Sequence, residues 1–262
     1  MPGPDAKADL ALLIEAAREA GKIARSFFRE DPETWDKADG AGPVTEADLA
    51  VDAMLRDRLM AARPDYGWLS EETEDDPARL DRDRVFIIDP IDGTQAFIEG
   101  ASAFAHSLAV VERGQPIAAA VYLPIREKMY AAAIGLGATM NAAPIRTSAR
   151  TEVAGAELLA TRHTMTDAHW PGGVPAVERV YRPSLAYRMS LVAEGRFDGM
   201  ATFRPTWEWD IAAGALIIAE AGGTATDGAG NPLRFNRALP QVAGVLATAP
   251  GLHAGLLDRR KA

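Results

Sequence analysis

Two aspartates stand three residues apart in the segment Asp89-Pro90-Ile91-Asp92-Gly93-Thr94. The apolar run 85–88 before it predicts a short buried β-strand, so both carboxylates should lie at a strand end. Aspartate before glycine is also common in ordinary turns. The repeated Asp at a strand end, with the Ile91 carbonyl between the two side chains, instead favours an oxygen-only site for Mg²⁺ or Mn²⁺ bound together with a phosphate.

Further acidic residues are candidates to complete this site. Of the pair Glu71-Glu72, Glu71 is the predicted ligand and Glu72 lies beside it, although such a pair in a loop is often a solvated surface. Asp210 begins the apolar stretch 209–221, which is predicted to be a helix. An acid at that place is favoured by the helix dipole alone. As a ligand, Asp210 would close the site from the second half of the chain on a rigid support.

Thr94 and Asp48 form a second candidate pair. Hydrolysis of a phosphate ester needs a water held in line with the departing oxygen, and a threonine hydroxyl bonded to a carboxylate can orient such a water. Asp48 also has the spacing of a capping box with Thr45, and the two roles are compatible. The backbone N–H groups of Gly93 and Thr94 are candidates for phosphate binding at the start of a helix.

Composition excludes several classes of function. The chain has 262 residues, 48% hydrophobic and 25% charged, and no cysteine. It therefore has no disulfides, thiolate nucleophiles or cysteine-based zinc sites, which fits a cytoplasmic location. A net charge of −9 without basic stretches argues against a nucleic-acid polymer as partner. The start lacks the pattern of a signal peptide, and no apolar run approaches the roughly 20 residues of a membrane span.

Hydrophobic periodicity organises the chain into two predicted domains. Helices are predicted at 5–30, 45–62, 184–194 and 209–221. Strands are predicted at 85–88, 104–111, 117–123, 128–133, 157–161, 197–202 and 241–248, with the three between 104 and 133 antiparallel. Segments 31–43, 66–82 and 135–141 are predicted loops. We expect an α+β domain at 1–145 with most metal ligands, and an α/β domain at 146–262 that supplies Asp210 and substrate contacts.

Four motifs together resemble the inositol monophosphatase superfamily. They are Val44–Asp48, Ser70–Glu72, the DPIDGT segment 89–94 and the stretch Trp209–Gly223, and the resemblance covers nearly the whole chain. It implies hydrolysis of small phosphate monoesters that depends on Mg²⁺ and is sensitive to lithium. The implied fold is α+β, a layered α/β/α/β/α sandwich of the type shared with fructose-1,6-bisphosphatase, in a homodimer.

The resemblance also assigns roles to individual residues. It implies two or three Mg²⁺ ions per active site, for which Mn²⁺ can substitute. Gly93 and Thr94 match the turn that binds phosphate and orients water, and Asp48 matches the acid paired with that threonine. Lys37 matches a mobile lysine found near the metals. The positions that match metal ligands are Glu71, Asp89, the Ile91 carbonyl, Asp92 and Asp210.

The substrate is predicted from a segment before Asp210. Inositol-specific members carry a glutamate seven residues before this aspartate, where this chain has Phe203. The string 203–210 is more similar to the 3′(2′),5′-bisphosphate nucleotidase branch, which implies adenosine 3′,5′-bisphosphate as substrate and AMP as product. Arg162 and Arg188 are candidates to bind the second phosphate, because a guanidinium forks onto phosphate oxygens, although either arginine could equally form a surface ion pair.

Other functions are left open by the sequence. The nearest alternative enzyme is an inositol-1-phosphate phosphatase, followed by a histidinol-phosphate or sugar-phosphate phosphatase. Outside the enzymes, the metal site could serve a regulatory protein that acts through a partner. Thr94 and Asp48 argue against that last function, because they serve the orientation of water more than the binding of metal.

Overall fold

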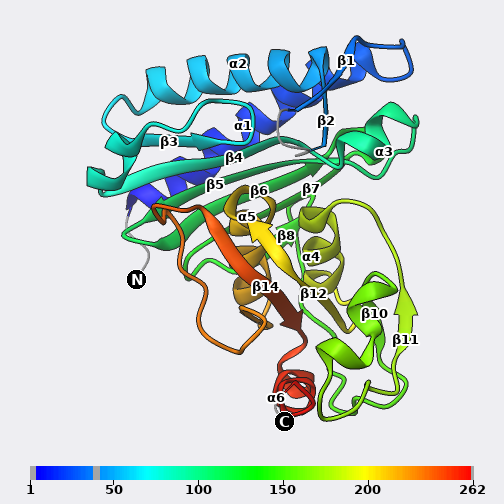
Figure 1. The fold of residues 1–262 in the computed structure, drawn as a ribbon. Helices are drawn as coiled ribbons and strands as arrows, with labels where there is room; N and C mark the ends of the chain where they lie inside the picture. Colours follow the sequence, from blue (N-terminus) through cyan, green and yellow to red (C-terminus); the bar gives the residue numbers. More distant parts are fainter. Residues whose placement is uncertain (1–3, 38–41, 261–262) are drawn as a thin grey trace.

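The computed structural model describes residues 4–37 and 42–260, and these fold into five alternating layers of helix and sheet (Figure 1). A pair of long helices covers a seven-stranded sheet, a second pair lies between this sheet and a five-stranded sheet, and a C-terminal helix lies beyond. The predicted layered α+β sandwich is therefore confirmed. One buried cluster includes core residues from both sides of the boundary expected at 145/146, and the division into two domains stays a prediction.

The larger sheet contains the start of the segment 89–94, which carries the two predicted aspartate ligands. Its spatial order is β3-β4-β5-β6-β7-β8-β9, with β3 and β4 parallel and every later pair antiparallel. The predicted antiparallel strands between 104 and 133 are β5, β6 and β7. The bounds are β3 Gly67–Ser70, β4 Arg84–Asp92, β5 Ala105–Glu112, β6 Gln115–Leu123, β7 Lys128–Ala133, β8 Ala138–Met140 and β9 Ala143–Pro144.

The first helix pair covers the outer face of this sheet. Helix α1 spans Pro4–Phe27 and α2 spans Glu46–Ala62, as their apolar spacing predicts. Thr45 caps α2, and its side chain and that of Asp48 exchange hydrogen bonds with each other's backbone N–H groups. The capping box predicted from sequence is therefore present, and it fixes Asp48 at the helix start.

The second helix pair lies between the two sheets (Figure 1). Helix α4 spans Leu185–Ala193 and α5 spans Glu208–Glu220. The two approach closely at Gly214, where an added Cβ would lie 2.7 Å from the Met189 side chain. Glycine is required there because any larger residue would separate the helices. Burial on both sides explains why α5 is apolar nearly all round.

The smaller sheet forms the fourth layer and has the order β11-β10-β12-β14-β13. Its first two pairings are parallel and the last two antiparallel, so it is a mixed sheet. Helix α6, Pro250–Asp258, packs against β14. The strands are β10 Glu157–Leu159, β11 Glu178–Val180, β12 Gly199–Trp207, β13 Thr224–Thr226 and β14 Gln241–Thr248.

Three of the predicted loops contain regular structure that local patterns did not reveal. Segment 31–43 contributes β1 (Thr34–Asp36), which pairs with β2 (Pro43–Thr45). Segment 66–82 contains β3 and a short 3₁₀-helix at Pro77–Asp81, and segment 135–141 contains β8. These strands are only three or four residues long, so their partners in the sheets define them more than their own composition does.

None of the helices in the described part of the chain is both long enough and apolar enough to cross a membrane.

Candidate active site

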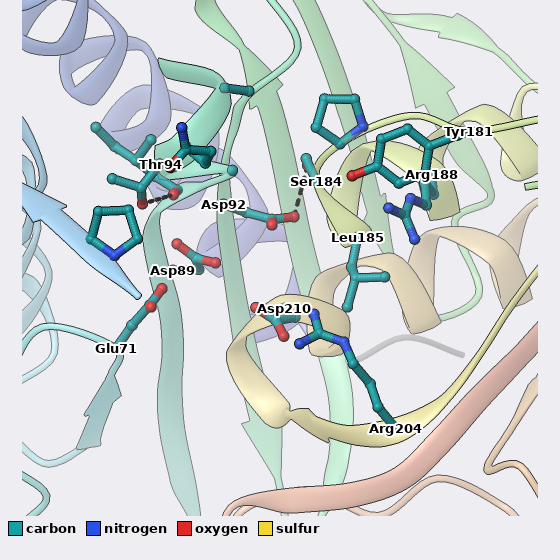
Figure 2. Close-up of a pocket in the computed structure, with 16 residues that line it drawn as sticks. Glu71, Asp89, Asp92, Thr94, Tyr181, Ser184, Leu185, Arg188, Arg204 and Asp210 are labelled. Carbon is teal, nitrogen blue, oxygen red and sulfur yellow. Dashed lines mark hydrogen bonds between the residues drawn. The ribbon is translucent and has the colours of Figure 1, made fainter. Parts of the chain in front are cut away.

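Three aspartates meet where the larger sheet faces the inner helices (Figure 2). Asp89 and Asp92 lie at the end of β4, and Asp210 lies in the first turn of α5. One carboxylate oxygen from each lies within 4.8 Å of the others. A register shift between Asp89 and Asp92 marks a bulge, which lets both side chains turn toward the same space.

Asp89 has the least compensated charge in this cluster. It is 1% exposed, and within the described residues neither carboxylate oxygen has a hydrogen-bond partner. Burial raises its pKa well above the ordinary value, and the nearby Glu71, Asp92 and Asp210 add to the shift. A buried carboxylate without a partner is costly unless a cation neutralises it. Among the described residues, the three converging aspartates form no salt bridge with a basic side chain, so they fit a hard divalent metal.

Asp92 is held in a fixed orientation by the start of α4. Its Oδ2 accepts hydrogen bonds from Ser184 Oγ (2.7 Å) and from the backbone N–H of Ala186 (2.6 Å). Burial raises the pKa of Asp92 to about 6, and these hydrogen bonds oppose the shift. One oxygen is therefore engaged by the protein while the other is available to a metal.

The upstream acids are joined by a lysine. Lys37 Nζ lies 2.6 Å from carboxylate oxygens of both Glu71 and Glu72. Burial opposes the charge of Lys37, but the two carboxylates outweigh it and raise its pKa to about 12. Burial also raises the pKa of Glu72 to about 7. Glu71 points from its loop toward Asp89 (Figure 2), and Glu72 is the second partner of the lysine.

Removal of this lysine should strengthen metal binding. Lys37→Met takes a positive charge away from Glu71, and we expect Mn²⁺ to bind about three- to tenfold more tightly, because the ion no longer competes with an ammonium group. Titration followed by electron paramagnetic resonance measures the affinity, with the exposed Lys22→Met as control. Weaker Mn²⁺ binding in Lys37→Met would instead mean that the lysine organises Glu71 for the metal.

Thr94 connects the metal cluster to α2. Its Oγ1 lies 3.1 Å from Asp48 Oδ1 and 3.1 Å from the Ile91 carbonyl oxygen. The other oxygen of Asp48 accepts from the N–H (2.9 Å) and hydroxyl (2.6 Å) of Thr45. Burial raises the pKa of Asp48, and these hydrogen bonds oppose the shift. Asp48 therefore caps α2, as predicted, and also lies within hydrogen-bond distance of Thr94, while the role of this pair in orienting a water stays a prediction.

The turn between the cluster and Thr94 depends on Gly93. This residue has φ +100°, in the left-handed region, and begins the short helix α3 (Thr94–Ile98). The first N–H groups of a helix have no partner within it. The turn therefore brings unpaired N–H groups and the Ile91 carbonyl to the same cavity.

A pocket of about 400 Å³ opens above these groups. Its acidic floor is formed by Glu71, Asp89, Asp92 and Asp210. The rest of its lining includes basic and aromatic groups: Arg188 lies beside Tyr181, and the guanidinium of Arg204 lies beside Asp210 (Figure 2). The pocket therefore pairs a site for cations with a site for anions.

The chain matches the model of the inositol monophosphatase family over residues 5–262. It belongs to this family. A protein named inositol-1-monophosphatase from Rhizobium meliloti is 35% identical over 86% of this chain and 88% of its own. The 3′(2′),5′-bisphosphate nucleotidase CysQ of Escherichia coli is 32% identical over 85% of this chain and 92% of its own. The crystal structure of the extragenic suppressor protein suhB from Bartonella henselae superposes with TM-score 0.82 at 27% identity, covering 97% of this chain and 98% of that one.

As a member of the inositol monophosphatase family, the protein is a hydrolase of phosphoric monoesters. The structure brings together the residues predicted for this chemistry. They are Lys37, Asp48, Glu71, Glu72, Asp89, Ile91, Asp92, Gly93, Thr94 and Asp210.

The residues predicted to select the substrate lie in different places relative to the pocket. Arg188 lines the pocket, and its guanidinium lies 4.8 Å from the centre of the Tyr181 ring. Arg162 is exposed beside the short 3₁₀-helix His163–Met165 and is not among the residues that line the pocket. Phe203 points away from the site and packs against Trp170 at 5.2 Å between ring centres.

Sequence analysis missed Arg204, which faces the pocket next to Phe203. Successive side chains of a strand point to opposite faces, so the orientation of Phe203 toward Trp170 leaves its neighbour toward the pocket. A register shift in β12 between Thr202 and Pro205 lies at this point. Strand alternation would have indicated Arg204 if the orientation of Phe203 had been known.

Proposed function

We propose that this phosphatase removes one phosphate from a substrate that carries a second anionic group, and that adenosine 3′,5′-bisphosphate is such a substrate, with AMP as product. The observation that supports this most strongly is the pair Arg188 and Arg204, which line the same pocket as the acidic cluster. Inositol 1-phosphate, the alternative substrate, carries only hydroxyl groups besides its single phosphate and has no second anionic group for the two arginines.

The two arginines are near carboxylates of the cluster without being bound to them. Within the part of the chain that the structure describes, neither forms a salt bridge. Burial lowers the pKa of Arg188. Tyr181 and Asp92 oppose this shift, whereas the positive charge of Arg204 adds to it, so the two arginines repel each other. A phosphate between them would relieve this repulsion and accept several charge-assisted hydrogen bonds. The Tyr181 ring beside Arg188 offers an aromatic surface to a base.

Among the described residues, the acids that line the pocket are those of the predicted metal cluster, and no further acid lines it to bind sugar hydroxyls. The position of the glutamate in inositol-specific relatives is Phe203, which packs into the core on the far side of the strand. Glu208 is buried, and its oxygens accept from the backbone N–H groups of Asn236 (2.6 Å) and Arg237 (3.1 Å). This carboxylate is therefore committed to the fold, and it does not replace the missing glutamate.

The residues of the site would have three separate roles in the reaction: metal binding, orientation of a water and phosphate binding. Glu71, Asp89, Asp92, Asp210 and the Ile91 carbonyl would hold Mg²⁺. When bound, Mg²⁺ supplies Lewis-acid stabilisation of the phosphoryl oxygens and lowers the pKa of a water. Thr94 can donate its hydroxyl proton to Asp48 and accept a hydrogen bond from the attacking water, which leaves a lone pair of that water free for phosphorus. The N–H groups after Gly93 are available to the phosphate.

The resemblance implies further properties that we include in the proposal. These are lithium inhibition, a cytoplasmic location and a homodimer. Activity measured across a LiCl series tests the first of them, and sedimentation equilibrium tests the oligomeric state. Uninhibited activity or a monomer at micromolar concentration would remove the corresponding property without affecting the substrate assignment.

Phosphate release with Mg²⁺ from adenosine 3′,5′-bisphosphate, inositol 1-phosphate, histidinol phosphate and fructose 1,6-bisphosphate tests the substrate. We expect kcat/KM for the nucleotide to exceed that for inositol 1-phosphate by more than about tenfold, which is about 1.4 kcal/mol of differential transition-state binding. A preference for inositol 1-phosphate would overturn the assignment. Mn²⁺ binding without hydrolysis of any ester would support a regulatory protein instead.

Arg204→Gln tests the second anion site directly. We expect kcat/KM for adenosine 3′,5′-bisphosphate to fall about 10- to 100-fold, since a charge-assisted pair with phosphate is lost, while the value for inositol 1-phosphate changes less than about twofold. Arg234→Gln, an exposed arginine outside the pocket, is the matched control. A loss of nucleotide preference in Arg162→Gln and not in Arg204→Gln would move the site to Arg162.

A further inference from the structure

We propose that two adjacent residues of β5, His106 and Ser107, are positioning residues that set the spacing of the acidic cluster. His106 fixes the turn between Asp89 and Asp92, and Ser107 fixes the start of the helix that carries Asp210. Neither residue is among those that line the pocket, and neither is one of the three converging aspartates. Their side chains therefore act on the site through the backbone that they bind.

The β4 bulge leaves a backbone carbonyl that needs a donor. Asp89 pairs with Ser107 and Asp92 pairs with Ala105, so the two residues between the aspartates fall outside the regular ladder. The carbonyl of Pro90 is bonded instead by His106 Nδ1 at 2.5 Å. This contact ties the middle of the Asp89–Asp92 turn to the neighbouring strand. Rotation of that peptide would redirect the Ile91 carbonyl and both carboxylates.

Packing alone does not explain a histidine at this position. His106 is fully buried, and its ring lies among Phe104 and Tyr122. Within the described residues its Nε2 has no hydrogen-bond partner, a cost that an aliphatic side chain would avoid. Burial lowers the pKa of His106 to about 4, so the ring is neutral near pH 7. A neutral ring facing a carbonyl through Nδ1 must carry its proton there.

Ser107 makes the corresponding contact on the opposite face of the sheet. Its Oγ donates to the carbonyl oxygen of Trp209 at 2.9 Å, and Ser107 is itself fully buried. Trp209 directly precedes Asp210 in the chain. Adjacent side chains on one strand point to opposite faces, so this dipeptide holds the β4 turn on one side and the α5 start on the other.

The test measures Mn²⁺ binding rather than activity alone. Electron paramagnetic resonance titration is performed on folded protein, well below the unfolding temperature of each variant. His106→Leu removes the donor at similar size, and His106→Asn restores an N–H donor the same number of bonds from Cα. His253→Leu is the control, because His253 is also buried but binds Thr226 and Thr248 outside the site.

We expect His106→Leu to weaken Mn²⁺ binding about tenfold and to lower kcat. His106→Asn should recover most of the Mn²⁺ affinity and most of kcat. His253→Leu should change thermal stability only. Ser107→Ala should weaken Mn²⁺ binding several-fold, and Ser107→Thr should restore it. Unchanged Mn²⁺ affinity in both His106→Leu and Ser107→Ala would overturn the proposal and leave the pair with a purely structural role. If His106→Leu does not fold, the Ser107 variants and His106→Asn still decide.

Discussion

Asp89→Asn should make the metal-free protein more stable and the enzyme inactive. The carboxylate of Asp89 is buried, lacks a partner within the described residues and faces other carboxylates. An amide removes the repulsion and can donate to Asp92 or Asp210, so we expect a gain of about 1–3 kcal/mol in the free energy of unfolding without metal. The same change removes a charged ligand, and activity should fall about 10³-fold or more.

Thermal unfolding in a chelator measures the stability of the metal-free protein, and unfolding with Mg²⁺ measures the response to metal. Phosphate release measures the loss of activity. A gain of 1–3 kcal/mol corresponds to a rise in Tm of about 2–10 °C for a domain of this size. Wild type should be stabilised by Mg²⁺, whereas Asp89→Asn should respond little. Asp83→Asn is the control, because Asp83 is exposed and paired with Arg113. A lower Tm of Asp89→Asn in chelator would show that the carboxylate stabilises the fold without a metal.

The opposition between stability and function expected at Asp89 explains why this acidic cluster could be predicted from sequence. The DPIDGT turn places two acids beside a strand too apolar to be exposed, and Asp210 lies in the first turn of a helix that is apolar nearly all round. Acids at such positions contradict the local burial pattern. A local conflict of this kind is typical of a functional site.

Contacts between distant segments were not predictable in the same way. Ser184 and the Ala186 N–H bind Asp92 across 92 and 94 residues of chain. Periodicity predicted the helix at 184–194, but it did not indicate that the start of this helix would contact Asp92. Arg204 was not predicted because the sequence does not show which face of the strand carries Phe203 and which carries its neighbour. The short strands β1, β3 and β8 likewise depend on their partners. Periodicity describes one element at a time, whereas these features arise from packing between elements.

The roles of metal binding and water orientation should separate at Thr94. Thr94→Ala removes the hydroxyl that lies 3.1 Å from both Asp48 and the Ile91 carbonyl. We expect kcat to fall about 10²- to 10³-fold, because a positioned acid–base pair contributes an effect of this size. Mn²⁺ affinity should stay within about twofold of wild type, because Thr94 is not a predicted metal ligand.

Thr94→Ser is the matched control, since it keeps the hydroxyl and loses only a methyl group. It should retain activity within about tenfold of wild type. Single-turnover phosphate release and Mn²⁺ titration on the same preparations distinguish the two roles. If Thr94→Ala lost metal affinity as much as activity, its hydroxyl would act chiefly by holding the Ile91 carbonyl in place for the ion. The Thr94–Asp48 pair would then support the metal site, and another group would have to orient the water.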